Sequence, residues 1–402
     1  YCLDADPKNN KMLKDRKWSM NLTEVRSICP HFGIMEQQSG ANGWNTRMEA
    51  PAPKPGQMIL WAMQSIAHGA DYVSFFRWRT ACVGTEIYWH GILDYDNRDN
   101  RKLAEVRQIR DRVRAISDLA GSEYKAAFAL VKDYDNVADA RLDVWHGRLA
   151  KSSEQEIFVG AQESHTPYDI VYIHDGSAAE ELQKYPVLIY PHPMLLSEKR
   201  AELLKAYVEQ GGILIIGARS GLKDMDGHCV MAPMPGLLKN VSGSDVREFT
   251  FVGPADDAVS MEWNGKEVET GLFNDILSAE KPEAKVLAVY GGSYYAGSPA
   301  LVETAAGKGK VLHFGGTFTR ENIREFLAYT GVLEPWADQV AVPADCEIAV
   351  REKDGRRYLM VLNFAWEPRT VTLKQEAVDL DDGKILQGDV VLPAFGTKVY
   401  QL

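Results

Sequence analysis

Three short groups of chemically active residues lie within the first 105 positions of the chain. They are Glu36-Gln37-Gln38 followed by Trp44, then Phe75-Phe76-Arg77-Trp78-Arg79, and then the segment TEIYWHG with Glu86, Trp89 and His90. Carboxylate, guanidinium and imidazole groups bind hydroxyls, and aromatic rings stack on the apolar face of a pyranose. Residue types of this kind, gathered at one place, predict a sugar-binding site that contains a carboxylate.

The elements expected around these groups place them on a common face. Residues 31–37 are predicted as a buried strand and residues 70–77 as a second strand, and residues 54–69 and 100–119 are predicted as helices. Strand–helix–strand–helix order is typical of parallel β/α units. Because such folds carry their active sites beyond the carboxyl ends of the strands, we expect the three groups to meet there.

Each of these residues also has a purely structural interpretation. A glutamate at the end of a strand can pair with an arginine, and aromatic residues at strand ends often belong to the core. For any single residue this interpretation is the stronger one. The convergence of three groups on one face favours a site.

Composition narrows the range of partners and cofactors. The net charge of -11 argues against nucleic acid as a partner, and no apolar run of 18 residues is present, so no membrane partner is expected. The five cysteines lack CxxC spacing, which predicts free thiols in a reducing compartment and neither a zinc site nor a disulfide framework. We therefore expect a cytoplasmic protein without metal or cofactor, although the chain begins at Tyr1 and shows no targeting segment to examine.

The remaining chain predicts two further domains. Alternating strands and helices continue to about residue 333, which indicates a doubly wound α/β domain. Among them are strands at residues 187–190 and 213–217, the latter the apolar ILIIG, and helices at residues 197–210, capped by Ser197, and 320–329. The turn after this strand, Ala218-Arg219-Ser220-Gly221, contains no cysteine. Beyond residue 335 only short strands joined by turns are expected, which is typical of a small antiparallel β domain.

Three motifs in the first part of the chain carry a family resemblance. The segments MEQQSGANGW, KPGQMILWAMQSIAHGADYVSFFRWR and GTEIYWHGILD resemble the last part of the catalytic barrel of the β-galactosidases of glycoside hydrolase family 42. The resemblance extends over the later domains. It implies an α/β protein with the C-terminal segment of a (β/α)8 TIM barrel at residues 1–105. A flavodoxin-like or glutamine-amidotransferase-like trimerisation domain without a catalytic cysteine would follow at residues 106–333, and a small antiparallel β domain at residues 334–402.

The resemblance also implies roles for particular residues. Glu36 corresponds to the nucleophile of a retaining mechanism, and Trp44, Phe76, Glu86 and His90 correspond to residues that line the galactose subsite. Tyr1 matches a tyrosine that hydrogen-bonds the nucleophile. In many relatives the histidine follows the glutamate by three residues, whereas His90 follows Glu86 by four. The acid/base glutamate of the family follows strand four of the barrel, which this sequence does not contain.

Two functions follow as expectations. The first is a homotrimeric retaining glycosidase that cleaves terminal β-D-galactosides, with Glu36 in this chain and the acid/base residue outside it, so that the chain alone is inactive. The second is a noncatalytic oligomerisation or carbohydrate-binding protein that keeps only a remnant of the barrel. No amidotransferase activity is expected, because the turn at residues 218–221 lacks the necessary thiol.

Overall fold

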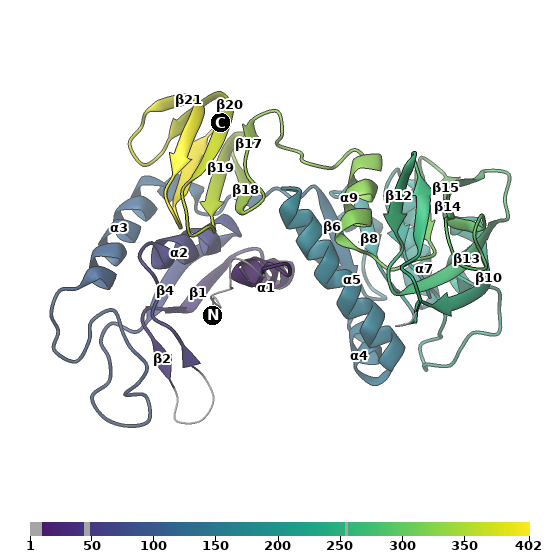
Figure 1. Cartoon of the computed structure of the whole chain (residues 1–402), viewed down its shortest axis with the longest axis horizontal. Helices are drawn as coiled ribbons and strands as arrows, with labels where there is room; N and C mark the ends of the chain where they lie inside the picture. Colours follow the sequence, from purple (N-terminus) through teal and green to yellow (C-terminus); the bar gives the residue numbers. More distant parts are fainter. Residues whose placement is uncertain (1–9, 44–48, 254–255) are drawn as a thin grey trace. The chain divides into compact units, whose positions relative to one another are not determined.

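The computed structural model describes residues 10–43, 49–253 and 256–402, and the chain divides into two compact units (Figure 1). The first unit combines the residues up to Lys125 with Glu334–Leu402, and the second unit is Ala126–Leu333. The first unit is therefore discontinuous in sequence. Helix α3 (Arg101–Ala115) crosses the domain boundary predicted between residues 105 and 106, and it belongs to the first unit.

The first part of this unit alternates helices and strands. Its elements are η1 (Lys14–Arg16), α1 (Lys17–Ile28), β1 (Phe32–Gln38), β2 (Asn42–Gly43), β3 (Glu49–Ala50), α2 (Gln57–Ala67), β4 (Ala70–Phe76), α3 and η2 (Ser117–Leu119). Strands β1 and β4 are parallel neighbours, with Phe32 opposite Ala70 and Gln38 opposite Phe76. The order β1–α2–β4–α3 is the β/α alternation that the sequence predicts.

Strand β1 is less buried than its apolar sequence suggests. Met35 is 66% exposed, and Glu36 beside it is exposed as well. Among the strands that the structure describes, β4 alone pairs with β1, so the other edge of β1 has no neighbour. The strand itself is confirmed, but the prediction that it is buried is wrong for this chain.

Helix α2 is apolar around most of its circumference because it packs on two sides. Met58 and Ala62 contact Ile109 of α3 together with Val73 and Phe75 of β4. Another stripe of α2, which includes Trp61 and Met63, packs into the core of the C-terminal sheet. A helix that is apolar all round is expected to be buried, and α2 meets this expectation inside the first unit.

The C-terminal sheet is antiparallel and covers α2 (Figure 1). Within the described residues its strand order is β17-β20-β22-β19-β18-β5, with β21 paired to β20. Its strands are β5 (Glu123–Tyr124), β17 (Val340–Ala341), β18 (Cys346–Lys353), β19 (Arg356–Asn363), β20 (Arg369–Asp379), β21 (Ile385–Leu392) and β22 (Thr397–Gln401). The small antiparallel β domain predicted from the sequence is therefore present.

A buried polar link fixes this sheet to the helices beneath it. The Glu347 carboxylate on β18 lies 2.7 Å from His68 Nε2 and accepts a 2.7 Å hydrogen bond from Ser19 Oγ. Arg351, also on β18, donates to the carbonyl oxygen of Ile66 at 2.8 Å. Because buried charges require close partners, these contacts fix the register of the sheet on α1 and α2.

The second unit has a flavodoxin-like parallel core. Its parallel strands are β6 (Phe128–Lys132), β7 (Tyr168–Tyr172), β8 (Val187–Tyr190), β9 (Ile213–Ile216) and β16 (Gly309–Phe314), in the spatial order β7-β6-β8-β9-β16. The helices around them are α4 (Tyr134–Leu142), α5 (Val144–Glu163), α6 (Ala179–Leu182), α7 (Glu198–Glu209) and α9 (Arg320–Tyr329). Leu204 of α7 packs with Val311 of β16, whereas Phe326 of α9 contacts Phe314 of the same strand. Helices therefore cover both faces of a doubly wound sheet.

An antiparallel extension continues this sheet beyond β16. Strands β15 (Pro299–Ala306), β14 (Ala284–Tyr290), β11 (Ser260–Trp263) and β12 (Lys266–Glu269) follow in that order. Strands β10 (Ser244–Phe251) and β13 (Phe273–Ala279) form a separate antiparallel pair, and η3 (Gly236–Leu238) and α8 (Lys239–Ser242) precede it. No helix in the described ranges combines the length and the apolar character that a membrane crossing requires.

Candidate active site

The end of β1 presents Glu36 beside the end of β4. Gln37 is paired with Phe75 and Gln38 with Phe76, so Glu36 and Phe76 lie at the ends of adjacent strands. The Glu36 carboxylate is exposed and has no hydrogen-bond or ion-pair partner within the described parts of the chain. Gln38 is buried and donates to the carbonyl oxygens of Gly40 and Pro51 at 2.9 and 3.1 Å. A buried amide therefore anchors the strand end while the carboxylate two residues earlier stays accessible.

One serine joins the two strand ends to the loop that follows β4. Ser39 is fully buried, and its Oγ accepts a 3.0 Å hydrogen bond from the Arg77 amide. The same hydroxyl lies 2.8 Å from the Phe76 carbonyl oxygen and 3.2 Å from that of His90. The peptide bond between Phe76 and Arg77 is cis. The sequence analysis did not identify Ser39 as part of the site.

Two glycines let these segments approach one another. A Cβ atom on Gly40 would lie 2.7 Å from His90 Cβ, and a Cβ on Gly91 would lie 2.7 Å from the Arg77 carbonyl oxygen. The loop is fixed further by the His90 amide, which donates to the Ala41 carbonyl at 2.9 Å. Side chains larger than hydrogen at these two positions would push the loop away from the strand ends.

The predicted residues Phe76, Glu86 and His90 come together through this packing. Glu86 forms an ion pair with Arg77, whose guanidinium group lies 4.4 Å from the centre of the Phe76 ring. The Phe76 ring also meets Trp89 edge to face at 6.1 Å. Two further predicted residues, Trp44 and Tyr1, lie outside the described residues. The arrangement thus places the loop that carries Glu86 and His90 next to the strand ends that carry Glu36 and Phe76.

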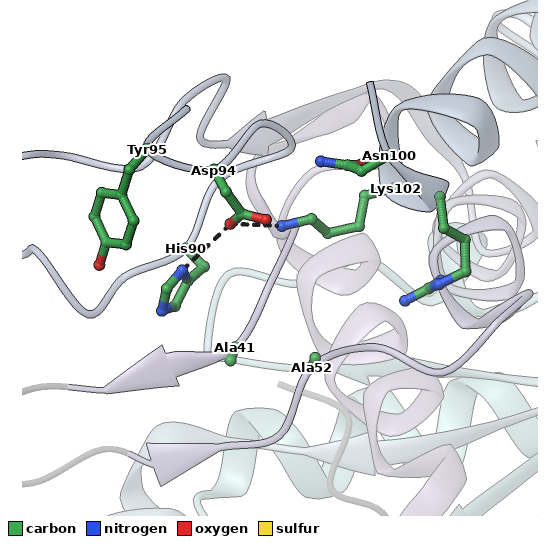
Figure 2. Close-up of a pocket in the computed structure, with 8 residues that line it drawn as sticks. Ala41, Ala52, His90, Asp94, Tyr95, Asn100 and Lys102 are labelled. Carbon is green, nitrogen blue, oxygen red and sulfur yellow. Dashed lines mark hydrogen bonds and ion pairs between the residues drawn. The ribbon is translucent and has the colours of Figure 1, made fainter. Parts of the chain in front are cut away.

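His90 also lines an open pocket of about 400 Å³ (Figure 2). It is lined by Ala41, Ala52, His90, Asp94, Tyr95, Asn100, Arg101 and Lys102. Asp94 lies between an imidazole and an ammonium group, with Oδ1 3.4 Å from His90 Nδ1 and 3.2 Å from Lys102 Nζ (Figure 2). The sequence analysis missed Asp94 and Lys102. The only available signal was their polar character on either side of the turn that precedes α3.

The turn after β9, in the second unit, has an unusual backbone. Arg219 adopts a left-handed conformation with φ of 65°, and its amide donates to Asp275 Oδ2 at 2.7 Å. Its guanidinium group lies 4.2 Å from the centre of the Phe249 ring. Arginine thus occupies the tight turn at which the sequence analysis looked for a cysteine. The chemistry of this turn is ionic and aromatic, with no thiol nucleophile.

Burial of Asp275 makes the stability of the second unit depend on pH. Burial raises the pKa of Asp275 to about 6, although the Arg219 amide and guanidinium group oppose this effect. The folded protein holds the Asp275 proton more tightly than the unfolded chain does, so the protonated carboxyl favours the folded state. This contribution to stability is complete below about pH 4. It is lost as the pH rises to about 6, and its full size is roughly 3 kcal/mol.

We expect Asp275→Asn to remove this loss. Relative to the parent, the variant should gain stability between pH 4 and pH 7, as measured by urea unfolding at both values. The quantity to compare is the free energy of unfolding of the variant minus that of the parent at each pH. Burial lowers the pKa of His192 and His313 to about 4, so both histidines make the protein more stable as the pH rises, opposite to Asp275, and the subtraction removes their effect. Asp256→Asn, at an exposed position, is the control. An equal pH slope in the Asp275 variant and the parent would contradict the prediction.

One group of side chains in the described residues has the spacing of metal ligands. Asp224, Asp226 and His228 bring their ligand atoms within 4.8 Å of one another, and most of this group is exposed. The Asp224 carboxylate already accepts hydrogen bonds from the amides of Asp226 and His228, at 3.0 and 2.9 Å. These hydrogen bonds explain why the three side chains lie close together, and we assign no metal to this group.

Comparison with protein families gives three matches along the chain. Residues 1–116 match the model described as beta-galactosidase, residues 129–332 the beta-galactosidase trimerisation domain, and residues 345–402 the beta-galactosidase C-terminal domain. All three belong to glycoside hydrolase family 42. The matches follow the same order as the barrel segment, the α/β unit and the C-terminal sheet.

Individual relatives agree with this result. Beta-galactosidase BgaA of Clostridium cellulovorans is 30% identical over 386 residues, which are 92% of this chain and 55% of the relative. Beta-galactosidase BgaB of a Geobacillus species is 28% identical over 393 residues, 95% of this chain and 56% of the relative. The chain thus spans a little over half the length of the curated relatives it matches.

Solved structures show the same fold. Gan42B, a GH42 beta-galactosidase, superposes with a TM-score of 0.88 at 23% identity, covering 100% of this chain and 58% of that one. The beta-galactosidase of Bacillus circulans sp. alkalophilus gives a TM-score of 0.84 at 23% identity, covering 100% and 59%.

Proposed function

The chain belongs to the β-galactosidases of glycoside hydrolase family 42, and we propose that it forms part of an enzyme that hydrolyses terminal β-D-galactosides with retention. The observation that carries this proposal is the accessible carboxylate of Glu36 at the end of β1, since Ser39 just after it joins this strand end to the Phe76 end of β4 and to the His90 loop. Hydrolysis of a nitrophenyl β-D-galactoside by the complete protein, with and without Glu36, tests the assignment.

Glu36 is the proposed nucleophile. One carboxylate oxygen attacks the anomeric carbon as the bond to the leaving oxygen breaks, and a carboxylic acid protonates that oxygen. Water then attacks the same carbon and gives a proton back to the acid, which frees Glu36 and releases β-galactose. A retaining site requires the two carboxyl groups to lie about 5 Å apart. We propose that the acid is supplied by a part of the barrel outside this chain.

The residues around Glu36 have proposed binding roles. The Phe76 ring offers an apolar face for the sugar, and the ion pair with Arg77 orients Glu86 as an acceptor for sugar hydroxyls. His90 would bind a hydroxyl from the loop that Ser39 holds in place. Trp44 and Tyr1 keep the binding roles that the family resemblance implies.

We propose that the protein assembles as a homotrimer through the second unit, which matches the trimerisation domain. Exposed aromatic residues on this unit support the proposal. Trp145 lies 5.0 Å from Phe251, which is 49% exposed, and Arg148 and Arg219 stack on Trp145 and Phe249. Tryptophan, phenylalanine and arginine are enriched at protein interfaces.

Light scattering on the complete protein should give the mass of a trimer at micromolar concentration. Replacing Trp145 and Phe251 together with Ala should weaken the assembly at least about tenfold, because central aromatic residues carry much of an interface's binding energy. Ile385→Ala, an exposed apolar position on β21, is the matched control. A stable parent monomer would contradict the trimer, whereas an unaffected trimer in the double variant would contradict this surface.

A noncatalytic assembly or carbohydrate-binding protein is the second candidate. It is favoured by the large share of the chain, residues 129–332, that matches the trimerisation domain. Such a protein would bind galactosides without turnover that depends on Glu36. For either function we propose the cytoplasm as the location, since the four described cysteines are free thiols, as is usual in a reducing compartment.

A further inference from the structure

We propose that Ser39 is a positioning residue of the galactoside site, and this inference rests on the proposed function. Its single hydroxyl group connects three segments, each of which carries a residue with a proposed role. These are the end of β1 with Glu36, the end of β4 with Phe76, and the loop with Glu86 and His90. Ser39 itself is fully buried and would not contact the substrate.

The Ser39 hydroxyl group makes the next hydrogen bonds beyond the end of the β1–β4 ladder. Pairing between β1 and β4 extends to Gln38 and Phe76, and Ser39 is the first residue after β1. Its Oγ accepts from the Arg77 amide at 3.0 Å and can donate to the Phe76 carbonyl at 2.8 Å. The side chain therefore pairs with one donor and one acceptor of the part-buried backbone just beyond the strand ladder.

The loop also lies against this hydroxyl group. The carbonyl oxygens of Arg77 and His90 lie 3.3 and 3.2 Å from Ser39 Oγ, and Gly40 packs against His90 with no room for a side chain. A shift of the Arg77 backbone would be passed to Glu86 through their ion pair, and a shift of residue 90 would move the imidazole. Small displacements of positioning groups are known to have large effects on rate.

The rest of the loop is held by contacts that do not involve Ser39. The Ile92 and Leu93 amides donate to the carbonyls of Arg77 and Trp78 at 2.7 and 2.8 Å, and the Gly91 amide donates to Thr80 Oγ1 at 3.0 Å. Loss of the Ser39 hydroxyl should therefore loosen the strand ends and the loop next to them while the unit stays folded.

The test compares Ser39→Ala with Ser65→Ala in the complete protein. Ser65 is a fully buried serine on α2 whose hydroxyl donates only to the Trp61 carbonyl of its own helix, at 3.0 Å, among the contacts described. In Ser39→Ala, amide hydrogen exchange in peptides covering residues 76–78 and 86–91 should accelerate at least about tenfold. In Ser65→Ala these peptides should exchange as in the parent. Unchanged exchange in Ser39→Ala would overturn the inference, whether or not the protein hydrolyses galactosides.

Kinetics distinguish positioning from general destabilisation. We expect Ser39→Ala to lower kcat/KM for a nitrophenyl β-galactoside about 10- to 100-fold and Ser65→Ala to lower it less than about threefold. In a His90→Ala background the Ser39 effect should shrink, because a group that acts through another loses its effect once that group is removed. Strictly additive effects, or equal losses in both serine variants, would overturn the inference. If the parent shows no turnover that depends on Glu36, the proposed function is overturned. The hydrogen-exchange comparison then still tests whether Ser39 positions the strand ends and the loop.

Discussion

Replacing Glu36 with Ala in the complete enzyme should lower kcat/KM for a nitrophenyl β-D-galactoside by on the order of 10⁴-fold or more, as expected for loss of a catalytic nucleophile. The substitution removes the only atoms proposed to bond to the anomeric carbon. Because Glu36 is exposed and without a partner in the described residues, its removal should leave the fold intact. Circular dichroism and the unfolding midpoint should match those of the parent.

Azide gives this experiment a positive signal. A small anion that fits the space left by the carboxylate should attack from the same face and yield the α-galactosyl azide, which mass spectrometry and NMR identify. Glu123→Ala is the matched control, since it removes an exposed carboxylate from β5, a strand of the C-terminal sheet. Near-normal turnover in Glu36→Ala would remove this residue from the nucleophile role.

The 402-residue chain by itself should show no turnover of the same substrate. Two independent reasons lead to this expectation. The acid/base carboxyl is proposed to lie outside the chain, and a (β/α)8 barrel positions its strand ends only when eight strands close. In the described residues β1 and β4 form a two-stranded sheet, and the free edge of β1 leaves Glu36 exposed.

Complementation turns this negative result into a positive one. An N-terminal barrel segment taken from the relative BgaA is expected to restore measurable activity when it is co-expressed with the chain as a separate polypeptide. Restoration should fail with Glu36→Ala and persist with Glu123→Ala. Substantial turnover dependent on Glu36 by the pure chain, with its mass confirmed, would overturn this account and make Glu86 the first residue to examine as the acid.

Local signals predicted some elements almost to the residue. Helix α7 begins after Ser197, whose hydroxyl accepts from the Arg200 amide at 3.2 Å, as its capping sequence indicates. Helix α9 and strand β8 also have the predicted bounds. These elements combine a clear periodicity with a capping residue or a continuous apolar run, so their own sequence determines them.

Other parts depend on contacts that no local pattern contains. Strands β10 to β15 were not predicted, because each is stabilised by its neighbour in an antiparallel pair, and β10 has exposed residues over much of its length. Helices α4 and α5 were also missed. The burial of β1 was overestimated because an apolar run does not reveal which neighbouring strands are present.

The candidate site shows the same division. Residue type and position at strand ends indicated Glu36, Phe76, Glu86 and His90, whose roles stay predictions. Ser39 was not identified, because its partners are backbone groups 37, 38 and 51 residues away, and any sequence can supply a carbonyl or an amide. Asp94 was missed for a similar reason, since its significance depends on the positions of His90 and Lys102.

The two-sided packing of α2 has a consequence for synthesis on the ribosome. The helix ends at Ala67, whereas β18, the first long strand of the sheet that covers its second side, begins at Cys346, 279 residues later. At about 5–20 residues per second, roughly 15–60 seconds pass between the two. During that interval the stripe with Trp61 and Met63 lacks its final cover while the whole second unit is being made. The nascent chain should therefore be a client of ribosome-associated chaperones until its last strands emerge.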